Sequence, residues 1–230
     1  MSATICSNNL KTICSNIKKH SPYPSKVQVV AVTKGFDSSA ITSAISNQVK
    51  CIGENRVQEF SNKTQRLDCS KIKSHLIGHL QSNKAKKATE LFDVIQTIDS
   101  TKLAQTINKH ALILNKKQHI YIQINIGNDT NKFGFTSKSI LNEVEKIQKL
   151  QHLTIKGVMT ILPYLENIQE TEPLFNKTRQ LAQDIQKKIT PQCTNISMGM
   201  SRDYIYALRQ GATHIRIGTM LYGQRPNYTN

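Results

Sequence analysis

The stretch VQVVAVTK, residues 27–34, is an apolar run rich in β-branched residues that ends in a lysine. Lys34 is the only charged residue between Lys26 and Asp37. Such a run is typical of a buried strand, because β-branched side chains pack well on a pleated surface. An amine at the end of a buried strand is partly desolvated, which lowers its pKa and favours the neutral, nucleophilic form. Lys34 is therefore a candidate nucleophile for a carbonyl compound, and a strand-end lysine that simply reaches solvent is the alternative.

Seven further runs follow, and longer segments with helical patterning separate them. The eight expected strands are residues 27–32, 50–53, 75–78, 93–98, 119–126, 155–161, 193–197 and 214–217. Ile5, Leu10, Ile13 and Ile17 have the spacing of one helix face, which predicts an additional N-terminal helix. Eight alternating strand–helix units predict the α/β class and a closed (β/α)8 TIM barrel rather than an open doubly wound sheet. No linker or repeat divides residues 1–230, so we expect a single domain.

The chain is basic, with 31 Lys and Arg against 15 Asp and Glu and a formal net charge of +16. A charge of this size is compatible with nucleic acid, an anionic membrane or an acidic ligand. Lysine outnumbers arginine 24 to 7 and asparagine occurs 18 times, which indicates a bias over the whole chain rather than one binding face. We therefore expect a solvated basic surface, with a nucleic-acid-associated barrel as the alternative.

The cysteine pattern argues for a reducing compartment. The five cysteines, at positions 6, 14, 51, 69 and 193, form no C-x-x-C pair, so neither a disulfide framework nor a zinc site is indicated. No apolar stretch approaches the length of a membrane span. The first 36 residues lack acids, as transit peptides do, but they also lack arginine. We expect a cytoplasmic protein that does not bind membranes.

Polar residues follow most of the expected strands, and in a barrel these strand ends share one rim, where active sites are built. Ser201 follows the seventh strand and Gly218-Thr219 follow the eighth. Loops at these two positions frequently bind phosphate through helix N-termini, although each residue could instead serve only as a helix cap. A desolvated lysine and a phosphate site on one rim suggest pyridoxal 5′-phosphate (PLP) held as a Schiff base.

Five stretches in order strengthen this interpretation, and each includes an expected strand end. They are AVTK (31–34), IGENRVQE (52–59), HLIGHLQSNK (75–84), NISMGMSRD (195–203) and GATHIRIGTMLYGQR (211–225). With these stretches the sequence resembles the pyridoxal phosphate homeostasis protein family, whose barrel is similar to the N-terminal domain of alanine racemase. The resemblance spans nearly the whole chain.

The resemblance also implies roles for individual residues. By it, Lys34 forms the Schiff base, Asn55 lies beside the cofactor ring and Met159 contributes to the wall of the ring's pocket. Ser201, Gly218 and Thr219 bind the phosphate, and Arg216 faces the pyridine nitrogen. Met159 could instead be an ordinary core residue. Arg56 could be a charge on a helix surface rather than a cofactor contact. No residue is expected to be catalytic, and no metal is expected.

The sequence departs from the family pattern at a few positions. Ser74 stands where an aromatic residue is frequent, Gly127 where a serine is common and Asp129 where a glutamate is common. The role of the loop 125–134 is therefore open. Arg202 stands where an acidic residue is frequent, and it would strengthen anion attraction if it pointed into the site.

The expected function depends on what surrounds the cofactor. Arginine is permanently protonated, so Arg216 would keep the pyridine nitrogen unprotonated and the ring a poor electron sink. In alanine racemase a second domain and a partner subunit complete the site and supply a tyrosine base, and we expect no such domain in this chain. Tyr164 is the nearest candidate base, and a role in the core or rim is favoured for it. We expect a non-catalytic monomer that buffers, carries or delivers PLP to client enzymes, with an amino-acid racemase-like enzyme as the alternative.

Overall fold

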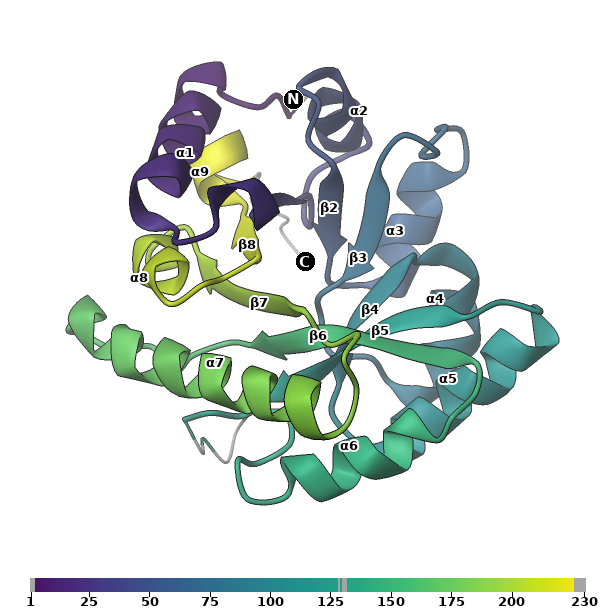
Figure 1. Ribbon diagram of the computed structural model, residues 1–230. Coiled ribbons are helices and arrows are strands. Elements are labelled where there is room, and N and C mark those ends of the chain that lie inside the picture. Colours follow the sequence, from purple (N-terminus) through teal and green to yellow (C-terminus); the bar gives the residue numbers. More distant parts are fainter. Residues whose placement is uncertain (1–2, 128, 130–131, 226–230) are drawn as a thin grey trace.

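The computed structural model describes residues 3–127, 129 and 132–225. Its eight parallel strands close into a barrel in sequential order, β1-β2-β3-β4-β5-β6-β7-β8, with β1 paired to β8 (Figure 1). The strands are β1 (Gln28–Val32), β2 (Cys51–Glu54), β3 (Lys73–Leu76), β4 (Val94–Ile98), β5 (Gln118–Ile124), β6 (Leu153–Thr160), β7 (Asn195–Met200) and β8 (His214–Ile217). The predicted (β/α)8 barrel is confirmed.

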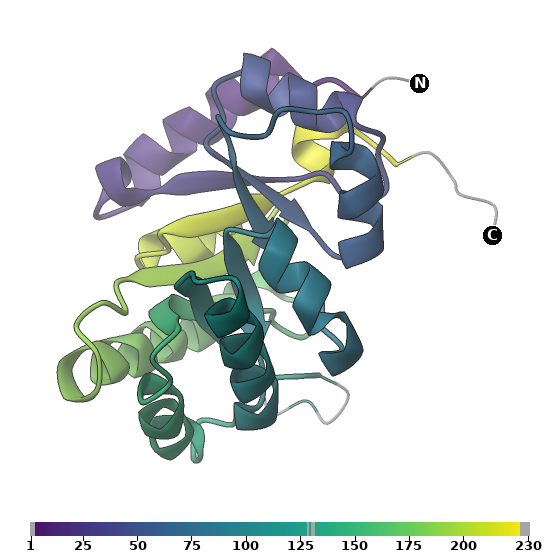
Figure 2. The ribbon, with the colours of Figure 1, turned by 90° about the vertical axis from the view of Figure 1, so that its right-hand side faces the viewer.

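Helices surround the strands on the outside of the barrel (Figures 1 and 2). They are α1 (Ser7–His20), α2 (Ser39–Ser46), α3 (Val57–Thr64), α4 (Ala85–Leu91), α5 (Thr101–Ile113), α6 (Ile140–Gln148), α7 (Thr171–Lys188), α8 (Tyr204–Arg209) and α9 (Thr219–Tyr222). Short 3-10 turns lie at Pro24–Lys26, Ser82–Lys84 and Ile168–Glu170. The predicted N-terminal helix is α1. It contacts α8 and α9, and the Asn16 amide donates to the Tyr204 hydroxyl.

The predicted strands lie at the observed positions: β8 and the ends of β1 and β4 coincide with the prediction, and the other strand ends differ by one to three residues. The largest difference is at β7, which ends at Met200 rather than at Ser197. This strand also begins at Asn195 rather than at Cys193. The Cys193 amide donates to the Thr190 carbonyl at 3.1 Å and closes a turn, so the chain becomes extended only after it. At β3 the pairing begins early, because the Lys73 amide already donates to the Lys50 carbonyl at 2.9 Å.

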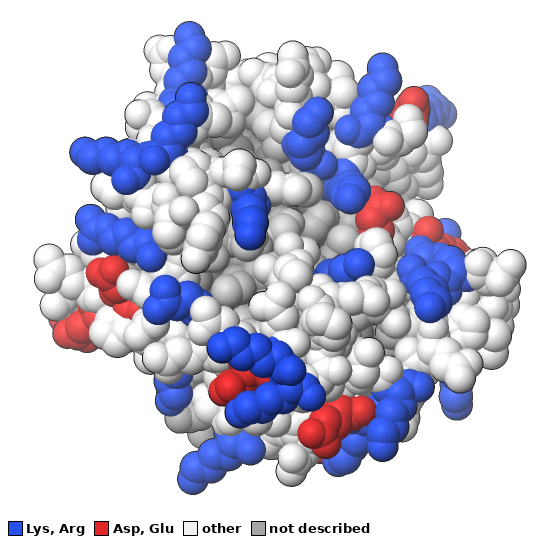
Figure 3. All heavy atoms as spheres, in the orientation of Figure 1, with Lys and Arg blue, Asp and Glu red and all other residues white. Residues whose placement is uncertain are grey.

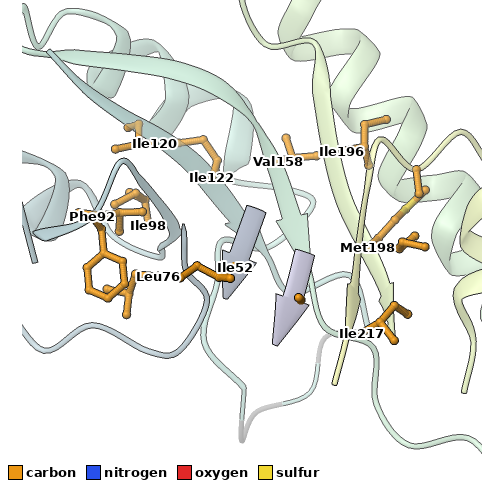
Figure 4. Close-up of a cluster of buried hydrophobic side chains, with 14 of the residues drawn as sticks. Ile52, Leu76, Phe92, Ile98, Ile120, Ile122, Val158, Ile196, Met198 and Ile217 are labelled. Carbon is orange, nitrogen blue, oxygen red and sulfur yellow. The ribbon is translucent and has the colours of Figure 1, made fainter. Parts of the chain in front are cut away.

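Two sets of strand side chains form two different interiors. One set packs with apolar helix residues such as Ile107 and Phe175 in the main hydrophobic core, between strands and helices. Its strand members include Ile52, Leu76, Ile120, Val158, Ile196 and Ile217 (Figure 4). This layer is continuous around the barrel and accounts for the apolar runs in the sequence.

The alternate residues point into the barrel, where several are polar. The rings of His75 (β3), Tyr121 (β5) and His214 (β8) lie with centroids 5.7–6.4 Å apart. These strands are not neighbours in the sheet, so the contacts cross the interior. Barrel interiors are usually filled by Val, Ile and Leu. A polar interior is therefore a feature that needs an explanation.

The basic charge is spread out. On the face shown in Figure 3, Lys and Arg side chains occur all around the outline, with acidic side chains among them in several places. This distribution agrees with the expected solvated surface rather than with one basic patch on that face. Within the part of the chain that the structure describes, no helix has the length and apolar composition needed to cross a bilayer.

Candidate functional site

Lys34 and the residues from the end of β8 lie side by side on the barrel rim. The closing pair of strands aligns Val30 with Arg216 and Ala31 with Ile217. A Cβ atom added at Gly218 would lie 3.3 Å from Cβ of Val32, so the chain after β8 packs closely on the end of β1. Closure of the barrel therefore brings together residues that are more than 180 positions apart in the sequence.

The turn that carries Lys34 is fixed from both sides by α3. The Lys63 amine donates to the Thr33 carbonyl at 2.8 Å, and the Gly35 amide donates to Oε1 of Glu59 at 2.6 Å. Gly35 has φ +74°, a conformation that glycine adopts without strain. Both peptide groups that flank Lys34 are therefore held, and the base of its side chain has a defined position.

A buried ionic cluster lies behind this turn. Lys63 also donates to Oε1 of Glu54 at 2.7 Å and to Oε1 of Glu59 at 2.6 Å, and the Thr33 hydroxyl donates to Glu54 at 2.7 Å. Glu54 is 1% exposed, and burial raises its pKa although Lys63 and Thr33 oppose the shift. Its other oxygen, Oε2, has no hydrogen-bond partner among the described residues.

The Lys34 amine has the expected electrostatics of a nucleophile. Burial lowers its pKa, and the Arg225 guanidinium adds to this shift, while Glu54 and Glu59 oppose it. A lower pKa increases the fraction of neutral amine at a given pH, and only the neutral amine attacks a carbonyl carbon.

Arg216 lies inside the barrel below this rim and is 4% exposed. Its Nη1 donates to the Ser197 hydroxyl at 2.8 Å, and its Nη2 donates to the Thr160 carbonyl at 2.7 Å. Burial lowers the pKa of Arg216 to about 10, with Asp203 opposing the shift, so the guanidinium stays charged at neutral pH. It offers only hydrogen-bond donors.

The loops after β7 and β8 contain the predicted phosphate residues. Gly218 is the N-cap of α9, and Thr219 is its first residue. Amides at the start of a helix have no carbonyl acceptor within that helix. In the other loop, Oδ1 of Asp203 accepts from the Met200 amide at 2.6 Å and fixes the turn that holds Ser201.

Arg202 does not point toward this pair of loops. Its guanidinium lies 4.3 Å from the ring centroid of Tyr164 and donates to the Glu166 carbonyl at 3.0 Å. The expected strengthening of anion attraction depended on an inward orientation, which the structure does not have. Tyr164 is 80% exposed and is engaged on the outer side of the rim.

Asn55 lines a cavity on the same rim. A cavity of about 240 Å³ is lined by Asn55, Ile77, Gly78, His79, Thr97, Gln123, Lys132, Phe133 and Ile161. An adjoining cavity of about 350 Å³ shares Asn55 and His79 with it. A Cβ atom at Gly78 would lie 2.2 Å from the Asn55 carbonyl oxygen, so only glycine allows the two strand ends to approach this closely.

Met159 lies deeper than the other predicted residues. It is fully buried and packs with Val94 and Tyr121 inside the barrel. It lies level with Ser197, which pairs with it in register and contacts Arg216. Its contribution to a ring pocket stays a prediction.

The loop 125–134 folds back onto β5. The Asn125 side chain donates to the carbonyls of Asp129 and Lys132, and the Lys132 amine donates to the Leu162 carbonyl at 2.6 Å. Gly134 has φ +123°, and a Cβ there would lie 2.8 Å from the Asn125 amide nitrogen. Residues 128, 130 and 131 of this loop lie outside the described part of the chain.

No individual role in the site was predicted from the sequence for Glu59, Lys63, Ser197, Gln96 or His75. Glu59 and Lys63 are spaced i,i+4 on α3, a pattern that usually marks an exposed ion pair. The other three are polar residues inside expected strands, and this was the available signal. No cluster of three or more metal-binding side chains is present in residues 3–127, 129 and 132–225.

Comparison with known proteins agrees with the geometry. The family profile described as "Alanine racemase, N-terminal domain" matches residues 5–226. The pyridoxal phosphate homeostasis protein of Aquifex aeolicus is 38% identical over 198 residues, 86% of this chain and 87% of the relative. That of Haemophilus influenzae is 35% identical over 224 residues, 96% of this chain and 92% of the relative.

Solved structures show the same fold. PipY of Synechococcus elongatus, solved without PLP, superposes with a TM-score of 0.85 at 36% identity and covers 94% of this chain and 99% of its own. The same protein with PLP bound gives 0.83 at 35% identity. Alanine racemase of Clostridium difficile superposes with a TM-score of 0.73 at 19% identity, and the match covers 98% of this chain and 59% of the racemase. This last similarity shows the fold alone. The chain belongs to the alanine racemase N-terminal domain family and, within it, to the pyridoxal phosphate homeostasis proteins.

Proposed function

We propose that this protein binds PLP as a reversible Schiff base on Lys34 and maintains the intracellular supply of the cofactor. It buffers PLP, carries it or delivers it to client enzymes in the cytoplasm, as a monomer. The names of its relatives and the PLP-bound PipY structure support the cofactor.

The observation that carries the proposal is the placement of Lys34. Its amine has a lowered pKa and its turn is held on both sides. Arg216 lies on the adjoining strand, and Gly218 directly follows that strand. PLP carries three groups that a protein can bind: a pyridine nitrogen, a phosphate, and an aldehyde that condenses with an amine. The chain offers one group for each of them.

We assign the phosphate to Ser201, Gly218 and Thr219, because backbone amides and hydroxyls at helix starts bind anions. Arg216 is assigned to the pyridine nitrogen, Asn55 to the side of the ring and Met159 to the pocket wall below it. These assignments use residues from β1, β2, β6, β7 and β8, so the cofactor would lie across the rim.

We further propose that the protein is not an amino-acid racemase or another PLP enzyme. An unprotonated pyridine nitrogen stabilises a carbanion poorly, and Arg216 can only donate to it. Tyr164, the candidate base nearest to the strand ends, is exposed and stacks with Arg202. The racemase alternative requires a proton-transfer group that this residue does not provide.

The binding proposal is tested by borohydride reduction of the PLP-loaded protein and mass mapping of the modified lysine. The label is expected on Lys34, and Lys34→Ala should lose the absorbance of the bound cofactor. Lys132→Ala is the matched control, because burial also lowers the pKa of Lys132. A label mainly on Lys132 or on a surface lysine would refute the assignment.

The non-catalytic proposal is tested by the exchange of solvent deuterium into the α-carbon of a panel of amino acids. Slow or absent exchange is expected. Exchange that depends on Lys34, at an enzymatic rate of about 1–10³ s⁻¹, would establish the racemase-like alternative instead.

A further inference from the structure

A chain of buried hydrogen bonds runs from Arg216 across the barrel interior. Arg216 Nη1 lies 2.8 Å from the Ser197 hydroxyl, which lies 2.7 Å from Oε1 of Gln96. Nε2 of Gln96 lies 2.7 Å from Nδ1 of His75. The four residues come from β8, β7, β4 and β3, and none is more than 4% exposed. The chain therefore joins opposite walls of the barrel.

The direction of each bond in this chain follows from arginine, which can only donate, and from the orientation of the Gln96 amide. Arginine can only donate, so Ser197 must accept from Arg216. The structure places Oε1 of Gln96 toward Ser197, and an amide oxygen only accepts, so the Ser197 hydroxyl donates to it. The NH2 end of Gln96 consequently donates to Nδ1 of His75.

The far end of the chain is a neutral histidine in a single tautomer. Because Nδ1 of His75 accepts, its hydrogen must be on Nε2, which has no hydrogen-bond partner among the described residues. Burial holds the pKa of His75 well below its usual value, and His214, Lys73 and His119 add to the shift. The Tyr121 and His214 rings pack directly against it. A charge on His75 is disfavoured, so the direction of the chain is not reversed at ordinary pH.

We propose that Gln96 and His75 are positioning residues for Arg216, because they hold the Ser197 hydroxyl as an acceptor and so fix the guanidinium below the cofactor ring. The inference rests on the proposed function, in which Arg216 faces the pyridine nitrogen. Without Gln96, the Ser197 hydroxyl can turn, and Arg216 loses a fixed acceptor on the side away from the ring. When the guanidinium is held less firmly, the ring nitrogen becomes easier to protonate.

The first test uses the protein without PLP, so it does not depend on the proposed function. Nitrogen-15 NMR of labelled histidine should show His75 as the neutral Nε2–H tautomer at neutral pH. Gln96→Leu should remove this single-tautomer signature. A charged His75, or the Nδ1–H tautomer, in the wild-type protein would overturn the chain.

The second test follows the absorbance of the bound cofactor against pH. Gln96→Leu and Ser197→Ala should each raise the pH midpoint of ring-nitrogen protonation by about 0.5–1 unit, the size expected for one neutral hydrogen bond. The double variant should shift it no further, because both substitutions break the same chain.

Gln118→Leu is the matched control. Gln118 is also a fully buried strand glutamine, but it donates to the carbonyls of Phe92 and Asp93, which are not part of the Arg216–His75 hydrogen-bond chain. An equal shift in this control, additive shifts in the double variant, or no shift in Gln96→Leu would overturn the positioning role. If the wild-type protein takes up no PLP, the proposed function and the role toward the ring both fail, whereas the tautomer measurement still decides whether the chain exists.

Discussion

Replacement of Lys63 by methionine should strongly destabilise the protein, although Lys63 lies on a surface helix. Its amine makes three contacts of 2.6–2.8 Å, with the Thr33 carbonyl and with the carboxylates of Glu54 and Glu59. The Lys63 side chain is 7% exposed and that of Glu54 is 1% exposed. Methionine keeps the length of the aliphatic chain but leaves the Glu54 charge buried without its counter-ion.

The magnitude follows from this burial. Removal of one partner of a buried ion pair costs about 3–5 kcal/mol, a large part of the roughly 5–15 kcal/mol that stabilises a typical domain. The pKa of Glu54 is already raised by burial, and the loss of Lys63 should raise it further. A carboxyl group with a raised pKa in the folded state destabilises the fold as pH rises through that pKa. The cost should therefore be larger at pH 8 than at pH 5.

Denaturant unfolding at these two pH values measures the effect. Adding Glu54→Gln to Lys63→Met should recover part of the loss, because the unpaired charge is removed. The control is Lys87→Met, which breaks the exposed Lys87–Glu90 pair and should change stability by no more than about 0.5 kcal/mol. A cost for Lys63→Met that equals the control, or that does not depend on pH, would refute the reasoning.

Three further predictions concern the site and the interior. Burial lowers the pKa of His214 from 6.5 to about 4, so stability should fall by about 3 kcal/mol as pH falls across this range, and His214→Phe should remove that part of the slope in acid unfolding curves. Burial also lowers the pKa of Lys34, so Lys34→Met should raise the melting temperature at pH 7, with a gain that shrinks as pH approaches 10.5; a loss of stability would contradict this. Pyridoxal should bind far more weakly than PLP in titrations, and Ser201→Ala with Thr219→Val should reduce that difference, since charge-assisted hydrogen bonds contribute about 1.5–3 kcal/mol each.

The fold could be predicted from the sequence because the outer faces of the strands carry a plain signal. Residues such as Ile52, Leu76 and Ile217 pack against helices, and each belongs to an apolar run bounded by polar residues. Lys34 and Gly218 could be placed on the same rim for a related reason, since all strands of a parallel barrel end on one side. The exact strand ends depended on single hydrogen bonds, such as that from Cys193 to Thr190, which no pattern records.

The interior could not be predicted in the same way. Gln96 and Ser197 are 101 residues apart and become partners only through the register of the closed barrel. The pair of Glu59 and Lys63 has the spacing of a surface salt bridge, and only the position of Glu54 behind the Lys34 turn makes it a buried cluster. Both networks are tertiary, and local patterning does not show which of their polar residues become partners.

One network supports the Lys34 turn and the other contacts Arg216, and their link to the proposed cofactor site gives a reason why a stable barrel contains them. A polar chain through the core and a buried carboxylate oxygen with no partner among the described residues are each less favourable than apolar packing. Violations of ordinary core composition are expected where function requires them. One network fixes the backbone on both sides of Lys34, and the other fixes the guanidinium of Arg216. Under the proposed function, a rigid pair of contacts would hold the aldehyde and ring ends of PLP. The Lys63 variant measures what the first network contributes to stability, and the Gln96 variant measures what the second contributes to the position of Arg216.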